Sequence, residues 1–595
     1  IWGSRWDPLL AKDTDGLLRR VMDETVDGEY QACKNKGGAY TREHFFGKYP
    51  ELKEMVANMS DEEVWRLNRG GHDSIKVYSA YEKAVRSEGR PTVILAKTVK
   101  GYGMGESGGE SANPAHQQKK LDDDALKEFR DRFNIPVSDE DIPRVPFCRP
   151  PEDSDEIEYL HERRRKLGGY LPQRRTRSES LQVPQLEAFS SQLEGTGERE
   201  ASTTMAFIRL LTTLARDKSI GKYVVPIVPD EARTFGMEGM FRQVGIYSSK
   251  GQLYTPQDAD QLMYYKEDKQ GQILEEGINE AGSFCSWAAA GTAYSNHDRP
   301  MIPFYIFYSM FGFQRIGDFI WAGGDMQSRG FLMGGTAGRT TLAGEGLQHQ
   351  DGHSLVLSST VPNCLSYDPT YAYELAVIIQ DGMRRMLHEQ ENVFYYITCM
   401  NENYVHPAMP KGVEDGILKG LYLLKIGGRG KVRVQLMGSG TILREVIAAA
   451  ELLEDDYSIP ADIWSATSFN QLRRDCLEVE RWNQLHPGEE PRRSYLDQCL
   501  ADKDGPFIAA TDYMKIVPDQ IQRWMPGQYV TLGTDGYGRS DRRSALRQHF
   551  EVDRRYIAVT ALKALADEGK LDMETVSDAI RRYAIDPDKP DPVTL

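Results

Sequence analysis

The sequence of 595 residues lacks the marks of several protein classes. Its seven cysteines are scattered and form no Cys-x-x-Cys pair, which argues against a disulfide framework or a zinc knuckle and suits a reducing compartment. The longest strongly apolar run, residues 301–313, is shorter than the roughly 20 residues that a membrane-spanning helix needs, and no signal peptide is visible. We therefore expect a cytoplasmic location and no membrane partner.

Positive charge is also scarce, since the formal net charge is −16. Binding to nucleic acid requires clustered Lys and Arg, so we expect no nucleic-acid partner. The basic run at residues 163–166 lies among acids, which favours a solvated linker. The chain also lacks an initiating methionine, and its apolar start leading into Gly3 and Ser4 is typical of the end of a strand. We expect it to be the later part of something longer.

Apolar residues make up 40% of the chain and aromatic residues 10%, enough for the cores of about three to four globular domains. Helix and strand patterns alternate, so the predicted fold class is α/β with mainly parallel sheets. We expect α/β blocks at residues 1–134, 199–410 and 411–595, and a proline-rich linker at residues 135–198. Specific expected elements are a buried strand at 92–97, a strand–helix–strand unit at 432–468 and closing helices at 556–569 and 572–584.

Glycines crowd the stretch from Gly101 to Gly109, directly after the expected strand. Glycine-rich turns after strands often bind phosphate. A dinucleotide fingerprint needs its last glycine to open a helix, and a Walker loop ends in Gly-Lys-Ser/Thr; neither pattern occurs here. The stretch is then either a surface hairpin or disordered loop, or a mobile functional loop that carries His116. We expect residues 103–114 to be irregular, with few buried contacts.

A carboxylate, Glu280, begins an expected helix that is apolar on all sides. A carboxylate at a helix start is usually a surface cap, favoured by the helix dipole. An all-apolar helix is buried, however, and a buried carboxylate needs a partner or has a raised pKa. Glu280 is therefore either a cap or a candidate acid or base.

Two histidines, His349 and His353, are four residues apart, a spacing that can bind metal on a helix. Neighbouring glycines disfavour a helix, and no third ligand stands nearby, so we assign no metal ligand. A loop that offers imidazoles for hydrogen bonding or proton transfer is better supported. The aromatic strand that leads to Tyr308 and Phe311 is either core or a shelf for a flat ring.

Several motifs together resemble one family over nearly the whole chain. They are RGGHD (69–73), TVKGYGMG (98–105), NPAHQ (113–117), PDEARTFGMEGMFRQVGIY (229–247), EEGINE (275–280), YSMFGFQRIGD (308–318), GLQHQDGHS (346–354) and LGTDGYGRSD (532–541). This set is similar to the homodimeric pyruvate dehydrogenase components of bacterial 2-oxoacid complexes, which are thiamine diphosphate enzymes of the transketolase-like class. The resemblance implies three transketolase-like domains: the C-terminal, incomplete part of a pyrophosphate-binding domain at 1–134, a pyrimidine-binding domain at 199–410 and a C-terminal domain at 411–595.

The same resemblance implies roles for single residues. Glu280 matches the catalytic glutamate that hydrogen-bonds the aminopyrimidine of the cofactor. His349 matches a histidine beside the reacting carbon, suited to protonating an alkoxide. His116 falls on the active-centre loop as a proton donor or acceptor. Contacts with cofactor or substrate are implied for Lys100, Asp230, Glu231, Tyr308 and Phe311, and a supporting place for His353.

The implied activity is decarboxylation of pyruvate with thiamine diphosphate, followed by reductive acetylation of a lipoyl group. The implied partners are a second copy of the chain and the dihydrolipoyl acetyltransferase with its lipoyl domains. The family binds Mg²⁺ and the diphosphate through Gly-Asp-Gly and a later Asn, a motif that this sequence lacks, so we expect it upstream of residue 1 and expect the fragment alone to be inactive. Two alternatives remain: a transketolase-like enzyme for another 2-oxoacid or a sugar, and a non-catalytic dimerisation module.

Overall fold

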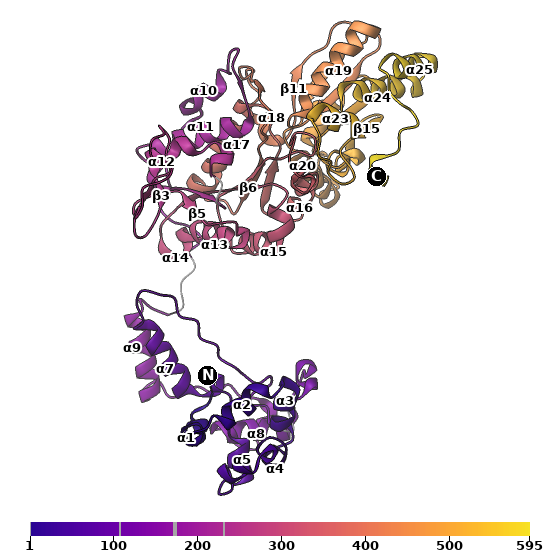
Figure 1. The fold of residues 1–595 in the computed structure, drawn as a ribbon. Helices are drawn as coiled ribbons and strands as arrows, with labels where there is room; N and C mark the ends of the chain where they lie inside the picture. The colour runs from indigo at the N-terminus through magenta and orange to yellow at the C-terminus, as the bar shows by residue number, and fades with distance from the viewer. Residues whose placement is uncertain (1, 106–108, 171–174, 230–231) are drawn as a thin grey trace. The chain divides into compact units, whose positions relative to one another are not determined.

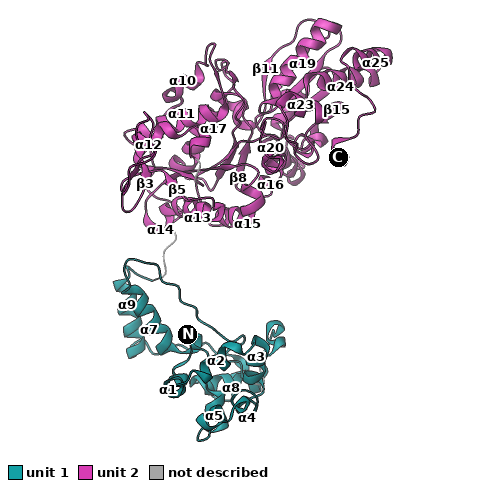
Figure 2. Ribbon diagram, in the orientation of Figure 1, with its two compact units in different colours: residues 1–171 teal, residues 172–595 magenta. Residues whose placement is uncertain are grey.

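The computed structural model describes residues 2–105, 109–170, 175–229 and 232–595. Packing divides the chain into two compact units, residues 1–171 and residues 172–595 (Figure 2). Within the described ranges, no helix combines the length and apolar content needed to cross a bilayer. All seven cysteines lie in these ranges and none of them forms a disulfide, as the absence of paired cysteine motifs predicts.

Unit 1 is built from helices around a small aromatic core. The rings of Trp6 and Phe46 stack with their centroids 6.1 Å apart, and Phe45 meets Phe46 edge-on at 5.0 Å. Ring pairs of this kind add about 0.5–1.5 kcal/mol beyond the burial of their area. The helices are α1 (Asp7–Lys12), α2 (Leu17–Glu24), α3 (Asp27–Asn35), α4 (Gly38–His44), α5 (Pro50–Met55), α6 (Asp61–Trp65), α7 (Ser74–Val85), α8 (Asp123–Phe133) and α9 (Asp155–Lys166) (Figure 1).

The prediction of a strand at residues 92–97 is wrong. This segment forms no ladder with any strand in the described part of the chain. A strand needs a neighbour for its backbone hydrogen bonds, and an apolar pattern cannot show whether that neighbour is present. The side chain of Val93 is accordingly exposed. The end of the segment is fixed, because the Gly71 amide donates to the Lys97 carbonyl at 3.0 Å.

The range expected as a linker, residues 135–198, carries helix α9. The Ser154 side chain caps this helix by accepting a hydrogen bond from the Ile157 amide at 3.4 Å. The basic run at residues 163–166 forms its last turn, where positive charge is favoured by the helix dipole. The charge run is therefore helical, and the bounds expected for the linker stay a prediction.

Unit 2 contains two mainly parallel sheets, which confirms the predicted class. In the first sheet six parallel strands follow the order β5-β2-β6-β7-β9-β8. Figure 1 shows α11 and α17 on one face and α13 and α15 on the other, which is why its strands are apolar on both sides. The bounds are β2 (Val224–Val228), β5 (Leu274–Glu275), β6 (Ile302–Tyr308), β7 (Phe331–Gly335), β8 (Cys364–Tyr367), β9 (Phe394–Thr398), α10 (Ser190–Leu193), α11 (Thr203–Arg216), α12 (Glu238–Val244), α13 (Glu280–Gly291), α14 (Ala293–His297), α15 (Gly312–Asp325), α16 (Ser354–Ser358) and α17 (Ala372–Met383).

The second sheet has the order β11-β13-β12-β14-β15, with β11 antiparallel to its neighbour. The predicted strand–helix–strand unit is confirmed as β12 (Val434–Gly438), α19 (Ile442–Tyr457) and β13 (Ala461–Ser465), with the two strands parallel. The closing helices are confirmed as α24 (Arg554–Asp567) and α25 (Met573–Arg582). The other elements are β11 (Tyr422–Lys425), β14 (Phe507–Ala510), β15 (Tyr529–Leu532), α18 (Glu414–Lys419), α20 (Phe469–Leu485), α21 (Tyr495–Leu500), α22 (Ile516–Asp519), α23 (Arg543–His549) and the short pairs β1 (Glu200–Ala201) with β10 (Tyr404–Val405) and β3 (Ile246–Tyr247) with β4 (Glu267–Asp268).

The carboxyl ends of strands from both sheets meet at a buried polar seam. Asp368 follows β8 and accepts hydrogen bonds from the hydroxyls of Thr398, at 2.6 Å, and Ser439, at 2.7 Å. Asp512, after β14, accepts from the backbone amides of Thr340, at 2.8 Å, and Thr341, at 3.1 Å. Side chains of each sheet thus satisfy buried groups of the other, which fixes their relation within unit 2.

Asp368 gives the stability of unit 2 a defined dependence on pH. Burial raises its pKa to about 7, whereas an unfolded aspartate titrates near ~3.9. The folded form therefore holds the proton in the interval between these values, so stability is greatest below it and is lost as pH rises toward 7. The shift corresponds to about 4 kcal/mol.

We expect Asp368→Asn to remove the loss of stability that occurs as pH rises toward 7. The amide stays neutral at every pH in this range, and its oxygen still accepts a hydroxyl hydrogen bond. Melting temperatures at pH 5.5 and pH 8 measure the effect. The native chain should lose more stability than the variant over this interval, while exposed Asp455→Asn should behave like the native chain. Parallel pH profiles for all three proteins would contradict the assignment.

Candidate active site

Glu280 lies at the first turn of α13, with its side chain 13% exposed. The helix is capped by another residue, because the Asn279 side chain accepts from the Gly282 amide at 3.0 Å. The carboxylate of Glu280 is instead bound by Arg315 on α15, with 2.6 Å between Nη1 and Oε1. Of the two interpretations open from the sequence, the cap is excluded, and Glu280 is a largely buried carboxylate with a cationic partner.

Beside this pair lies a cluster of aromatic rings. The His349 ring stacks on Tyr308, with centroids 5.5 Å apart and planes 13° from parallel, and meets Phe311 edge-on at 5.0 Å. The guanidinium of Arg315 lies 3.9 Å from the centre of the Phe311 ring, so it links the cluster to Glu280. The end of β6, the start of α15 and the loop before α16 thus bring these side chains together, as the aromatic-shelf interpretation requires.

The imidazole of His349 has an unused nitrogen. Its Nδ1 is buried without a hydrogen-bond partner in the described structure, and a carboxylate oxygen of Glu345 lies 3.7 Å away. His353 is engaged elsewhere, since its Nε2 is 2.8 Å from the amide oxygen of Gln314. Among the described residues no group of metal-binding side chains forms here or elsewhere. His349 is therefore available for hydrogen bonding or proton transfer.

Tyr305 contacts the backbone of Glu280. Burial, and then the negative charges of Glu280 and Glu276, raise the pKa of this phenol well above its usual range. The phenol therefore stays protonated, and it donates to the backbone carbonyl of Glu280 at 3.4 Å. This hydrogen bond ties the phenol to the backbone at the first turn of α13.

Two further candidates, Lys100 and His116, belong to unit 1, where they form a pair. The Nζ of Lys100 lies 2.6 Å from Nδ1 of His116. An ammonium group can only donate, so Nδ1 must accept and the imidazole proton sits on the other nitrogen. Both side chains are exposed. Asp230 and Glu231, also candidates, lie outside the described residues.

The glycine-rich loop contradicts the expectation of few buried contacts. Residues 103–105 and 109–112 form turns, as predicted, whereas residues 113–117 form a 3₁₀-helix and residues 106–108 lie outside the described residues. Glu110 is 5% exposed and accepts from the amides of Gly103, at 3.2 Å, and Gly105, at 3.3 Å. Arg132 on α8 donates to the same carboxylate. Gly103 is required because its φ is +92° and a Cβ there would lie 2.8 Å from Phe133. The glycines allow a tight turn around a buried carboxylate.

We expect Glu110→Ala to free this loop. The change leaves Arg132 and two amides unpaired in a buried place, at a cost of about 3–5 kcal/mol. Hydrogen exchange at Gly103 and Gly105 should be slow in the native chain and much faster in the variant, with exposed Asp124→Asn as a matched control on α8. Fast exchange at these amides in the native chain would mean that Glu110 does not hold the turn.

Two important partners escaped the sequence analysis. Arg315 is 35 positions from Glu280, and Glu110 is 22 positions from Arg132, so neither pair has a local pattern. The ring of His72, from the RGGHD motif, stacks on Tyr102 at 3.7 Å, which also has no local pattern. A charged residue within an apolar segment indicates that a partner of opposite charge lies nearby in the fold. Arg315, at the start of α15, is such a residue, so its sequence context could have pointed to a partner.

Comparison with known proteins shows which families the chain resembles. A family profile for the pyruvate dehydrogenase E1 component middle domain matches residues 181–407, and one for a transketolase-like C-terminal domain matches residues 420–553. Pyruvate dehydrogenase E1 components of Pseudomonas aeruginosa and Escherichia coli K12 are 62% and 58% identical to the chain, covering all of it and 67% of their own length.

Solved transketolases share the fold. That of Campylobacter jejuni has a TM-score of 0.57 at 16% identity, over 83% of this chain and 66% of its own. That of Leishmania mexicana has a TM-score of 0.56 at 13% identity, over 87% of this chain and 68% of its own. Identity at this level speaks for the transketolase-like fold alone, whereas the far higher identity to the E1 components decides the family. The chain belongs to the pyruvate dehydrogenase E1 component family.

Proposed function

We propose that this chain acts in the decarboxylation of pyruvate with thiamine diphosphate and in the transfer of the acetyl group to a lipoyl carrier. The observation that carries the proposal is the largely buried carboxylate of Glu280 beside the cluster of Tyr308, Phe311 and His349. A flat nitrogen heterocycle needs an apolar face and one carboxylate for a ring nitrogen, and this site offers both.

The residues present fit the pyrimidine half of the cofactor. Glu280 would hold the ring nitrogen, once Arg315 turns aside, and Tyr308 and Phe311 would pack the ring. Bound thiamine diphosphate would supply a carbon nucleophile and an electron sink for decarboxylation. We propose Mg²⁺ as the counter-ion of the diphosphate, and we assign no residue of this chain to it, because the described residues contain no group of metal-binding side chains.

The side chains of the site have separate proposed tasks. We propose that Glu280 holds or releases a proton at the ring nitrogen. Tyr305 supports Glu280 by donating a hydrogen bond to the backbone carbonyl of Glu280. His349, whose Nδ1 has no hydrogen-bond partner in the described structure, donates a proton to the oxygen of the substrate. His116 would move a proton during acetyl transfer, with Lys100 fixing its tautomer. Asp230 and Glu231 remain proposed contacts of cofactor and substrate.

The proposal also names partners and a location. An E1 component implies an acyltransferase partner, and we propose that this is the dihydrolipoyl acetyltransferase with its lipoyl domains. We propose that a second copy of the chain completes a homodimer. The free cysteines and the acidic charge are compatible with a cytoplasmic setting.

The test is release of carbon dioxide from pyruvate and from 2-oxobutyrate by the full-length enzyme in the assembled complex, with thiamine diphosphate and Mg²⁺. Release from pyruvate should exceed release from 2-oxobutyrate and should require Glu280. A preference for another 2-oxoacid, or activity that persists in Glu280→Gln, would contradict the proposal.

A further inference from the structure

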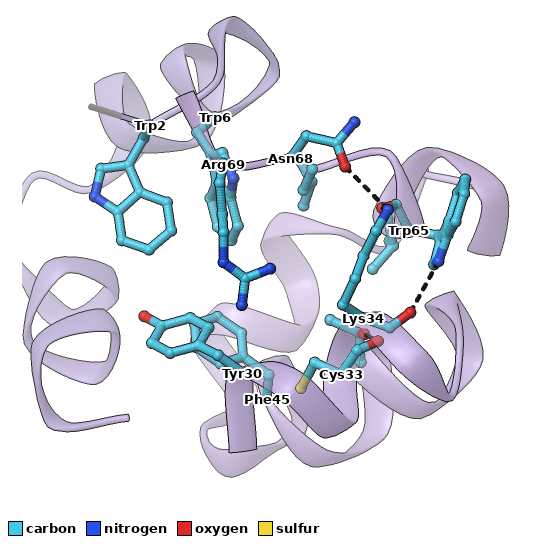
Figure 3. A pocket seen from close by; sticks show the side chains of 12 residues that line it. Trp2, Trp6, Tyr30, Cys33, Lys34, Phe45, Trp65, Asn68 and Arg69 are labelled. Atoms are coloured by element: carbon cyan, nitrogen blue, oxygen red, sulfur yellow. Dashed lines mark hydrogen bonds between the residues drawn. The ribbon is translucent and has the colours of Figure 1, made fainter. Parts of the chain in front are cut away.

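Unit 1 contains a small pocket lined by residues that the proposed mechanism does not use, and its walls are rich in aromatic rings (Figure 3). Its cavity volume is about 40 Å³. One buried water needs about 10–15 Å³, so the pocket has room for about three waters or one small anion. Its principal walls are Trp2, Trp6, Tyr30, Phe45, Lys34 and Arg69.

The guanidinium of Arg69 points from its backbone toward Tyr30 and Cys33 in this pocket (Figure 3). Its backbone is fixed by a bridge to Trp2. In the described part of the chain its side chain makes no hydrogen bond or ion pair, and its contact is with the Tyr30 ring, 5.9 Å from centroid to Cζ. Half-buried cations are normally paired, so an unpaired guanidinium indicates a missing acceptor.

A second donor in the pocket is also unsatisfied. Trp6 is 5% exposed, and its indole Nε1 is buried with no hydrogen-bond partner among the described residues. Lys34, by contrast, is satisfied, since it donates to Asn68 at 3.0 Å and lies over the Trp65 ring. Buried donors without partners are rare, and Trp6 and Arg69 both line this pocket, which points to an absent acceptor.

The charge of the pocket decides the kind of acceptor. No Asp or Glu is among its described lining residues, although the chain carries a net charge of −16. The guanidinium fork matches the two oxygens of a carboxylate, and the rings of Trp2 and Phe45 suit a methyl group. We propose that this pocket binds a small free monocarboxylate anion of the size of formate or acetate, through Arg69 and Trp6.

The experiment is a titration of the full chain with ¹³C-labelled acetate, followed by NMR line width and by calorimetry. Arg69→Gln should weaken binding tenfold or more, since a charge-assisted bidentate contact is lost. Arg66→Gln is the matched control, because Arg66 is exposed, pairs with Glu62 and lies three positions away. It should bind acetate as the native chain does.

Trp6→Phe removes the indole donor. Because Trp6 lies in the aromatic core of unit 1, the smaller ring should lower the melting temperature by several degrees. Acetate binding is therefore measured well below the melting transition, where it should be severalfold weaker than in the native chain. Arg69→Lys keeps the positive charge but loses the bidentate guanidinium, so it should bind acetate with intermediate affinity. This variant still tests the proposal if Arg69→Gln does not fold. Equal acetate affinity in the Arg69 and Arg66 variants, or no binding by the native chain, would overturn the proposal.

Discussion

Replacing Glu280 with Gln is expected to lower the rate of pyruvate decarboxylation by about a hundredfold or more, the usual scale of a lost general acid or base. The amide has the same shape, and its oxygen can still accept from Arg315 at the distance seen here, 2.6 Å. It cannot hold or release a proton at a ring nitrogen. The loss should therefore appear in turnover and not in folding.

The measurement is turnover of pyruvate by the assembled complex, with the melting temperature recorded alongside. Asp325→Asn is the matched control, because Asp325 is an exposed carboxylate at the end of α15. It should retain native turnover. Near-native turnover in Glu280→Gln would remove Glu280 from the mechanism, and a large fall in melting temperature would turn the rate loss into a structural effect.

The second large effect is a division of labour between His349 and His116. His349→Ala should lower decarboxylation by about a hundredfold, because it removes the imidazole stacked on Tyr308 beside the proposed ring site. The loss should be seen with an artificial electron acceptor and with the lipoyl domain alike. His116→Ala should lose a comparable factor with the lipoyl domain alone, since we assign it to acetyl transfer.

His353→Ala serves as the matched control for His349, because its imidazole is held by Gln314 and does not belong to the ring cluster. It should cost at most a few-fold in either assay. Lys100→Gln should follow His116→Ala in direction with a smaller loss, because it removes the donor that sets the tautomer of His116. Equal losses for His116→Ala in both assays would contradict the division.

Much of unit 2 could be predicted from sequence because its strands are buried on both faces and bounded by turn residues. The strands β6, β12 and β13 are buried almost along their whole length, as strands of a covered parallel sheet are. The segment at 92–97 has an apolar pattern of the same kind and forms no strand. The pattern reports the burial that a segment prefers, whereas a ladder also requires a neighbouring strand.

Part of the candidate site could also be predicted from the sequence, and part of it could not. Tyr308 and Phe311 are close in sequence, and the end of a strand places them together, so their cluster could be expected. The Arg315–Glu280 pair and the Glu110–Arg132 pair depend on which helices pack side by side, which no local pattern encodes. The chemical roles assigned to Glu280, His349 and His116 remain predictions until the variants are measured.

The buried polar seam has a consequence for how unit 2 melts. Asp368 and Asp512 tie the strand ends of the two sheets to each other, and one continuous hydrophobic cluster runs through both. Opening either sheet alone would leave these carboxyls and hydroxyls without partners. Residues 172–595 should therefore behave as a single cooperative body in calorimetry, with a van't Hoff enthalpy close to the calorimetric one, even though two family profiles divide the same stretch.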